Sequence, residues 1–180
     1  MTFFRPIAFG TLLLLSAVCS AADKPNVILI LADDQGWNGL SCQMDPNVPE
    51  SKSDYYQTPN IDRLANGGMR FSRGYAPAPV CSPTRHSIQF GISPAKTRVT
   101  YNSYGTKQHC NPELAMANLI KKADPSYATA HFGKWHLNQV NAPEGNPMPL
   151  SDPHNPGELG FDYWLSETNQ FNLDPQFSRN

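Results

Sequence analysis

Cys81 is the residue whose surroundings in the sequence most clearly suggest chemistry. It follows a proline-rich run and precedes Ser82, Pro83 and Arg85. Serine is a common N-cap and proline suits the first helical position, so we expect Cys81 to stand just before a short helix that ends at Gly91. The N–H groups at a helix start attract anions, and the Arg85 guanidinium could bind a tetrahedral oxyanion there. A capped helix start without chemistry is the alternative.

Two adjacent carboxylates, Asp33 and Asp34, follow a run of branched apolar residues, 27–32. Such a run is typical of a strand that is buried on both faces of a mostly parallel sheet. Sheets of this kind bind ligands at the carboxyl ends of their strands, where paired carboxylates suit a divalent cation such as calcium or magnesium. A solvated turn is the alternative, although two like charges beside a buried strand repel unless a cation lies between them.

A second predicted strand brings polar groups to the same edge of the sheet. Residues 127–132 predict a buried strand, which Lys134 and His136 follow. These two residues are two positions apart in the sequence. In an extended backbone both side chains therefore point to one side and could converge on an anion. A surface lysine and a loop histidine without chemistry are the alternatives.

The elements between these groups predict an α/β fold with a mostly parallel sheet and helices on both faces. Strands that alternate with helices form parallel βαβ units. Capping residues, proline and glycine positions and apolar spacing define the remaining elements. We expect a loop over 37–57, a helix over 58–68, a strand over 69–75, a helix from Asn111 to Lys122, a long loop over 139–157 and a strand over 160–164.

The first 22 residues are typical of a secretory signal peptide. Arg5 gives a basic start, an apolar run extends from Ile7 to Val18, and small residues end at Ala22. The apolar run is too short for a stable membrane span. We therefore expect a signal peptide over 1–22 and a periplasmic or extracellular, secreted protein from residue 23.

Cysteine number and charge narrow the possible functions. Cleavage after Ala22 leaves Cys42, Cys81 and Cys110, an odd number, so at least one thiol stays unpaired in an oxidising compartment. Such a thiol is either reactive or simply buried, and the pairing of Cys42 with Cys110 is open. The net charge is −1 and no basic run is present, so nothing favours nucleic acid.

Cys81-x-Pro83-x-Arg85 resembles the signature of the type I sulfatases, a family of the alkaline-phosphatase-like superfamily in which this cysteine is oxidised to formylglycine. The longer pattern of that family continues with leucine and then Thr-Gly, whereas this sequence has Gln89-Phe90-Gly91. Residues 25–36, 58–65 and 133–137 are similar to further segments of the family.

The resemblance implies an alkaline-phosphatase-like fold and an enzyme that hydrolyses sulfate esters. Asp33 and Asp34 would be calcium ligands, with magnesium possible, and the residue made from Cys81 would complete the coordination sphere. Arg85 and Lys134 would bind sulfate oxygens, and His136 would orient or deprotonate the formylglycine hydrate. The partners would be a formylglycine-generating enzyme and a sulfated small molecule or carbohydrate.

The ligand set for a cation is incomplete in this sequence. Calcium takes about six to eight oxygens, and two carboxylates supply too few. We therefore expect residues 23–180 to be the N-terminal part of a sulfatase catalytic domain that, alone, binds metal weakly and turns over poorly. The alternatives are a phosphodiesterase or phosphonate monoester hydrolase of the same superfamily, or a secreted, non-catalytic fragment whose cysteine is never converted.

Overall fold

The computed structural model describes residues 24–101, 110–137, 150, 152–167 and 178–179. The contacts within the chain define two units, Met1–Ala32 and Asp33–Asn180, and each is described by itself. The predicted signal peptide, 1–22, and most of the predicted loop over 139–157 lie outside the described residues. Within the described part of the chain, no helix has the length and apolar character needed to cross a membrane.

The described part of the first unit is an extended segment, residues 24–32, that forms no strand. Its apolar side chains are exposed, from 44% at Leu31 to 82% at Ile28. The prediction of a buried strand over 27–32 is therefore wrong for this structure. A strand that is buried on both faces needs hydrogen-bonded neighbours and covering layers, and no described residue supplies either.

Residues 33–80 contain little regular structure apart from the 3-10 helix η1, Pro49–Ser51, and the helix α1, Pro59–Gly67. The helix and the loop before it are as predicted, and Thr58 and Asp62 hold the loop through Ser41. The strand predicted over 69–75 is wrong, because this segment makes a turn with its apolar side chains exposed. An alternating pattern forms a strand only where another strand pairs with it.

Helix α2, Cys81–Phe90, begins two residues earlier than expected. Its N-cap is Val80, so Cys81 is the first helical residue and Ser82 is not the cap. The Ser82 hydroxyl instead donates a hydrogen bond to the backbone carbonyl of His136, 2.8 Å away. The predicted end is confirmed, because Gly91 closes the helix in the left-handed conformation with φ of 64°. The short helix α3, Pro94–Thr97, follows.

The predicted helix from Asn111 to Lys122 is divided into two elements. The Asn111 side chain caps the 3-10 helix η2, Pro112–Leu114, and helix α4, Met116–Ala123, begins after Ala115. Strand β1, Ala130–Lys134, starts three residues later than the strand predicted over 127–132. This shift includes Lys134 in the strand.

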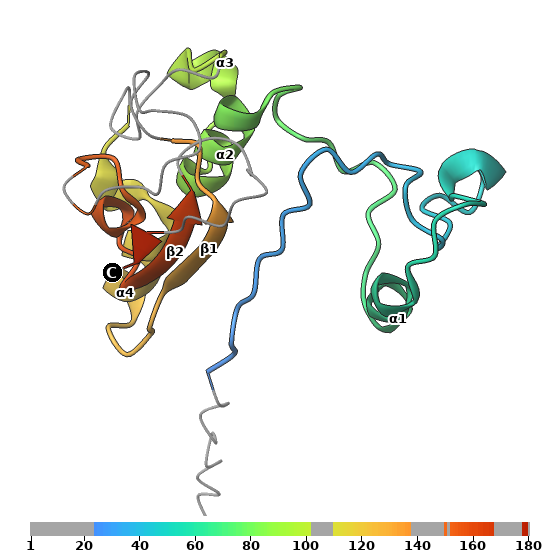
Figure 1. Cartoon of the computed structure of the whole chain (residues 1–180), viewed down its shortest axis with the longest axis horizontal. Helices are drawn as coiled ribbons and strands as arrows, with labels where there is room; N and C mark the ends of the chain where they lie inside the picture. The colour runs from blue at the N-terminus through green and yellow to red at the C-terminus, as the bar shows by residue number, and fades with distance from the viewer. Residues whose placement is uncertain (1–23, 102–109, 138–149, 151, 168–177, 180) are drawn as a thin grey trace, which may run out of the picture. The chain divides into compact units, whose positions relative to one another are not determined.

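The described sheet has three strands in the order β1-β2-β3 (Figure 1). Strand β2, Tyr163–Glu167, pairs with β1 in parallel, with Lys134 opposite Glu167, and follows the 3-10 helix η3, Pro156–Leu159. Strand β3, Ser178–Arg179, pairs with β2 antiparallel. The predicted parallel α/β arrangement is confirmed for β1 and β2. Strand β2 begins three residues later than the strand expected over 160–164.

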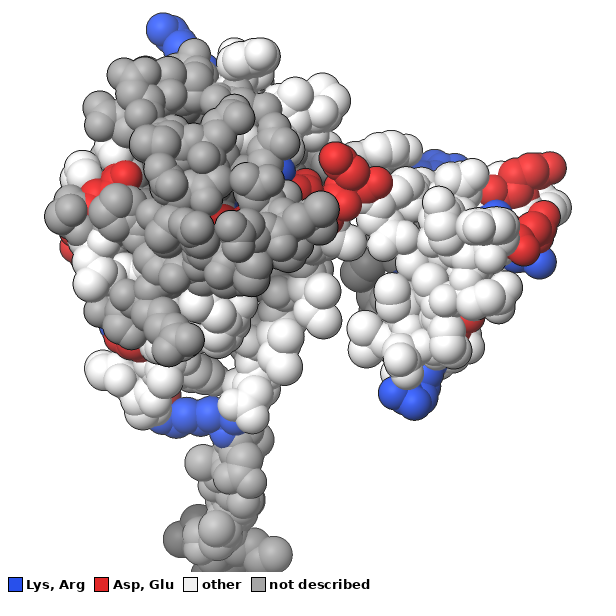
Figure 2. Space-filling view, in the orientation of Figure 1, with Lys and Arg blue, Asp and Glu red and all other residues white. Residues whose placement is uncertain are grey.

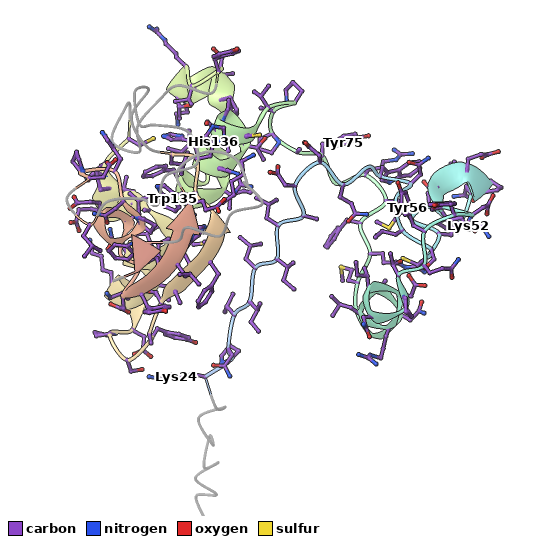
Figure 3. The ribbon with its side chains drawn as sticks, viewed as in Figure 1. Lys24, Lys52, Tyr56, Tyr75, Trp135 and His136 are labelled. Carbon is purple, nitrogen blue, oxygen red and sulfur yellow. The ribbon has the colours of Figure 1, made fainter. Side chains whose placement is uncertain are left out.

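The core joins α2, α4 and the residues after β1. Trp135 and Leu137 are each 1% exposed and pack with Phe90 from α2, Ala117 from α4 and their neighbours. Figure 3 shows Trp135 and His136 in the part of the structure that contains α2 and the strands. In Figure 2, the charged residues that are described and visible on this face form small separate groups.

Candidate active site

The thiol of Cys81 lies at the first turn of α2 and is half-buried. The ammonium of Lys134, the last residue of β1, donates to it over 3.2 Å from Nζ to Sγ. Because parallel strands present their carboxyl ends at one edge of a sheet, a lysine at the end of β1 reaches a group that stands beside that edge. The structure therefore brings together two of the residues that the sequence singles out.

Asp33 joins the same group from a distant part of the sequence. Its Oδ2 lies 2.7 Å from Lys134 Nζ and 3.6 Å from Arg85 Nη2. The hydrogen bond from Lys134, together with the charges of Lys134 and Arg85, lowers the pKa of the Asp33 carboxyl below its ordinary value. The carboxylate is therefore charged at neutral pH and balances two cations.

Arg85 lies one helical turn after Cys81, so its side chain and the thiol share a face of α2. The side chain is 11% exposed, and Nη1 donates a hydrogen bond to the backbone carbonyl of Lys134. Burial lowers the pKa of the guanidinium, but arginine stays charged at any relevant pH. Arg85 thus ties the first turn of α2 to the end of β1.

His136 follows β1 in a left-handed backbone conformation, with φ of 55°. Gly133 also has a positive φ, 92°, so the chain does not continue as a regular alternating strand. Burial, with Lys134 and Arg85 nearby, lowers the pKa of His136 to about 4, and the ring is neutral at pH 7. Its Nδ1 is buried and has no hydrogen-bond partner among the described residues.

The structure does not bring the Asp34 side chain into contact with the other predicted site residues. Its side chain is exposed and its backbone is left-handed, with φ of 56°. Within the described ranges, Asp34 makes no hydrogen bond or ion pair with the group formed by Asp33, Cys81, Arg85 and Lys134.

A complete metal site is not formed by these residues. Among the described residues, no group of three or more His, Cys, Asp or Glu side chains could hold a metal ion. The Asp33 carboxylate is also engaged by Lys134 and Arg85, and calcium takes about six to eight oxygens. The described donors therefore fit a divalent cation only as part of a larger ligand set.

The sequence did not predict the roles of two residues that lie next to this group. Ser82 reads as an N-cap, whereas its hydroxyl holds the His136 backbone. His131 lies in β1 with Nδ1 2.7 Å from Ser166 Oγ, and burial, with Arg85 nearby, lowers its pKa to about 4. Its position three residues before Lys134 was the only available signal, and spacing alone does not separate a buried histidine from an exposed one.

Comparison with known proteins gives a consistent result over most of the chain. A family model described as Sulfatase matches residues 25–177. The sequence is 35% identical over 146 residues to Arylsulfatase G of Rattus norvegicus, covering 80% of this chain and 24% of that protein. It is 33% identical over 172 residues to N-acetylgalactosamine-6-sulfatase of Sus scrofa, covering 88% of this chain and 29% of that protein.

Solved structures resemble this one over a similar share of their length. The crystal structure of Ps i-CgsB matches with a TM-score of 0.60 and 29% identity, covering 82% of this chain and 29% of the other. A sulfatase from a Bacteroides thetaiotaomicron locus for the metabolism of multiple glycosaminoglycans matches with a TM-score of 0.62 and 29% identity, with the same coverage. The chain thus spans between about a quarter and a third of the proteins it matches.

Proposed function

The chain belongs to the sulfatase family, and from this premise we propose that it is the N-terminal part of a catalytic domain that hydrolyses sulfate esters through a formylglycine made from Cys81. One observation carries the proposal: groups from three distant segments, Asp33, Cys81 with Arg85, and Lys134, meet within hydrogen-bond or ion-pair distance. Unrelated surface residues from distant segments are not expected to lie this close together.

The formylglycine hydrate would supply the hydroxyl that attacks sulfur and a second hydroxyl whose deprotonation releases sulfate. Arg85 and Lys134 supply two fixed cations beside the reacting atom, where they neutralise the charge that develops on the sulfuryl oxygens. Asp33 orients both cations. His136 is neutral at pH 7 and is therefore able to accept a proton.

Asp33 and Asp34 would supply part of the ligand set for calcium or magnesium, with the residue made from Cys81 as a further ligand. Because the described donors are too few, the remaining ligands would come from sequence outside the described residues. This predicts that the 180-residue chain binds calcium weakly. Titration of the chain with calcium by calorimetry measures the affinity, and tight, stoichiometric binding would contradict this partial ligand set.

The substrate would be a sulfated carbohydrate or another sulfated small molecule. A structure of Ps i-CgsB in complex with k-i-k-neocarrahexaose is among the similar structures, with a TM-score of 0.59 and 29% identity, and the name of one relative specifies an N-acetylgalactosamine 6-sulfate. A formylglycine-generating enzyme would be the second partner. Residues 1–22 would direct the protein to the periplasm or the extracellular space, and 23–180 would remain.

Conversion of Cys81 is the first experiment. The chain is produced with and without a formylglycine-generating enzyme, and the tryptic peptide Gly74–Arg85 is analysed by mass spectrometry. The proposal expects an aldehyde in that peptide only with the enzyme present, and loss of the aldehyde in the variant Cys81→Ala. An unchanged thiol under both conditions would instead support a non-catalytic fragment.

Turnover of two ester classes separates the remaining alternatives. The converted chain is assayed with an aryl sulfate and with aryl phosphate and phosphonate esters, in the presence of calcium. We expect slow release of sulfate that is abolished in Cys81→Ala. Faster turnover of phosphate or phosphonate esters would assign the chain to a phosphodiesterase or phosphonate monoester hydrolase of the same superfamily.

A further inference from the structure

The amine of Lys134 and the thiol of Cys81 are held at reactive distance. Nζ lies 3.2 Å from Sγ, within the range at which bound reactants are positioned for attack. The Lys134 side chain is only 12% exposed, and Asp33 holds Nζ through a 2.7 Å hydrogen bond. The backbone of Lys134 is fixed as well, because Arg85 donates to its carbonyl. The amine is therefore held beside the sulfur by several contacts.

We propose that Cys81, where it remains an unconverted thiol, forms a covalent sulfur–nitrogen bond with Lys134 when the protein meets a peroxide. This modification site is separate from sulfate ester hydrolysis, because it uses the thiol itself and requires neither formylglycine nor a bound cation. Oxidised thiols are known to condense with a neighbouring nitrogen to form a sulfenamide. Here the nitrogen would be the Lys134 amine, which lies 3.2 Å from the sulfur.

The reaction balances in two steps. Hydrogen peroxide oxidises the Cys81 thiol to a sulfenic acid, and one water is released as the peroxide is reduced. The uncharged Lys134 amine then attacks Sγ, an S–N bond forms, the S–O bond breaks, and the hydroxyl leaves with an amine proton as a second water. The ammonium first gives its additional proton to solvent. The product has two hydrogens fewer than the starting thiol and amine.

The other described cysteines lack this arrangement. Cys42 is buried and its thiol faces the Asp62 carboxylate, which offers no nucleophilic nitrogen. Cys110 is half-buried like Cys81, but it packs against the hydrophobic core and no contact like that between Lys134 and Cys81 is formed there among the described residues. Cys81 is only half-buried, so a molecule as small as a peroxide can reach it. The link is therefore expected at one cysteine and one lysine. It would also block conversion to formylglycine, because the sulfur would no longer be a thiol.

The test is peptide mapping without reducing agent. The chain, shown by intact mass to carry the thiol, is treated with a small excess of hydrogen peroxide and digested with trypsin. We expect Gly74–Arg85 to be joined to a peptide that spans Ala123–Arg179, since trypsin cannot cleave after a modified Lys134. The mass should be that of the two peptides less two hydrogens, and dithiothreitol should separate them.

Three controls make the result decisive. Lys134→Arg retains a cation next to Asp33 but has no amine of comparable nucleophilicity, so the linked peptide should disappear, while Lys121→Arg should leave its yield unchanged. The unsubstituted protein in denaturing urea should also give no link, because Lys134 and Cys81 are then no longer held close together. The proposal is wrong if Cys81 in the folded chain becomes only sulfinic acid or a disulfide, or if it joins several lysines with similar yield.

Discussion

Asp33 and Asp162 form a matched pair of surface carboxylates in this structure. Asp33 accepts a hydrogen bond from Lys134, and Asp162 accepts one from Lys121. In both cases the lysine is the largest cause of a pKa below the ordinary value. Asp33 differs in having a second cation, Arg85, nearby. Such pairs stabilise the folded state only while the carboxylate is charged.

The first prediction concerns Lys134→Gln. Loss of the amine should raise the pKa of Asp33 toward its ordinary value of 3.8, which carbon-detected NMR titration of the carboxyl measures. Since the folded pKa of native Asp33 is lowered, its contribution to stability is present above the unfolded pKa and is lost as pH falls through the folded pKa. The variant should lose that contribution. Lys121→Gln is the control, and it should shift the titration of Asp162 while leaving Asp33 unchanged.

The second prediction concerns His131, a basic side chain that is buried in its neutral form. Burial lowers its pKa from 6.5 to about 4, so the unfolded chain binds a proton more readily than the folded one between these values. Stability should be complete above pH 6.5 and should fall as pH decreases toward 4, by at most about 3 kcal/mol for one such group. In His131→Gln, the slope of the unfolding free energy against pH should be shallower in this window. An unchanged slope would show that the pKa of His131 is the same in the folded and the unfolded chain.

The residues that form the candidate active site were largely predictable from the sequence, but the contacts between them were not. The sequence placed Asp33, as a cation ligand, and Cys81, Arg85 and Lys134, as anion-binding groups, at one edge of a sheet. The structure brings these four residues together, although 27–32 forms no strand. The contact between the Arg85 guanidinium and the Lys134 backbone carbonyl was not foreseen. Every residue has a carbonyl, so the sequence carries no signal for such a bond.

At the scale of the element, helix α2 offers a comparison between two buried serines. Ser82 donates to the carbonyl of His136, whereas the hydroxyl of Ser87 is buried with no hydrogen-bond partner among the described residues. Ser82→Ala should therefore cost about 1–2 kcal/mol, because the partly buried hydrogen bond to the His136 carbonyl is lost. Ser87→Ala should be neutral or stabilising, since it removes an unsatisfied group. Urea unfolding of both variants measures the difference, and equal losses would refute the assignment.

The end of α2 leads to a further prediction. Gly91 has φ of 64°, and a Cβ added there would meet no atom within 4 Å. Gly91→Ala should therefore destabilise the fold by about 1–2 kcal/mol through backbone conformation alone. Gly67, the last residue of α1, has equal space but no left-handed φ. Gly67→Ala should be neutral or slightly stabilising, and chemical unfolding of both variants tests the contrast.

Helices were predicted more accurately than strands. Proline, glycine and capping residues lie within the elements that they define, so local sequence is sufficient for α1 and for the end of α2. Strands depend on partners that are remote in the sequence, and 27–32 and 69–75 have no partner among the described residues. For the same reason, β1 is displaced toward Lys134, where it pairs with β2.

At the scale of the whole chain, the apolar segment 27–31 is exposed in the described part of the first unit, residues 24–32. Ile28 and Ile30 are 82% and 78% exposed. An unpaired, uncharged segment of high β-propensity is prone to associate with other copies. We expect the chain to form concentration-dependent aggregates, and the double variant Ile28→Lys/Ile30→Lys to reduce them without changing the midpoint of urea unfolding. Light scattering over a range of concentrations measures this, and unchanged scattering would contradict it.

Trp135 lies in the core with its indole N–H bonded to the backbone carbonyl of His154 and its ring against that of His131, with centroids 4.9 Å apart. An imidazolium ion quenches the fluorescence of an indole that it touches, whereas a neutral imidazole does so only weakly. Emission from Trp135 should therefore dim as His131 takes up a proton, near pH 4. Lys134 of the candidate active site directly precedes Trp135 in the sequence. The fluorescence of Trp135 is therefore an intrinsic optical reporter beside this site, readable without any added label.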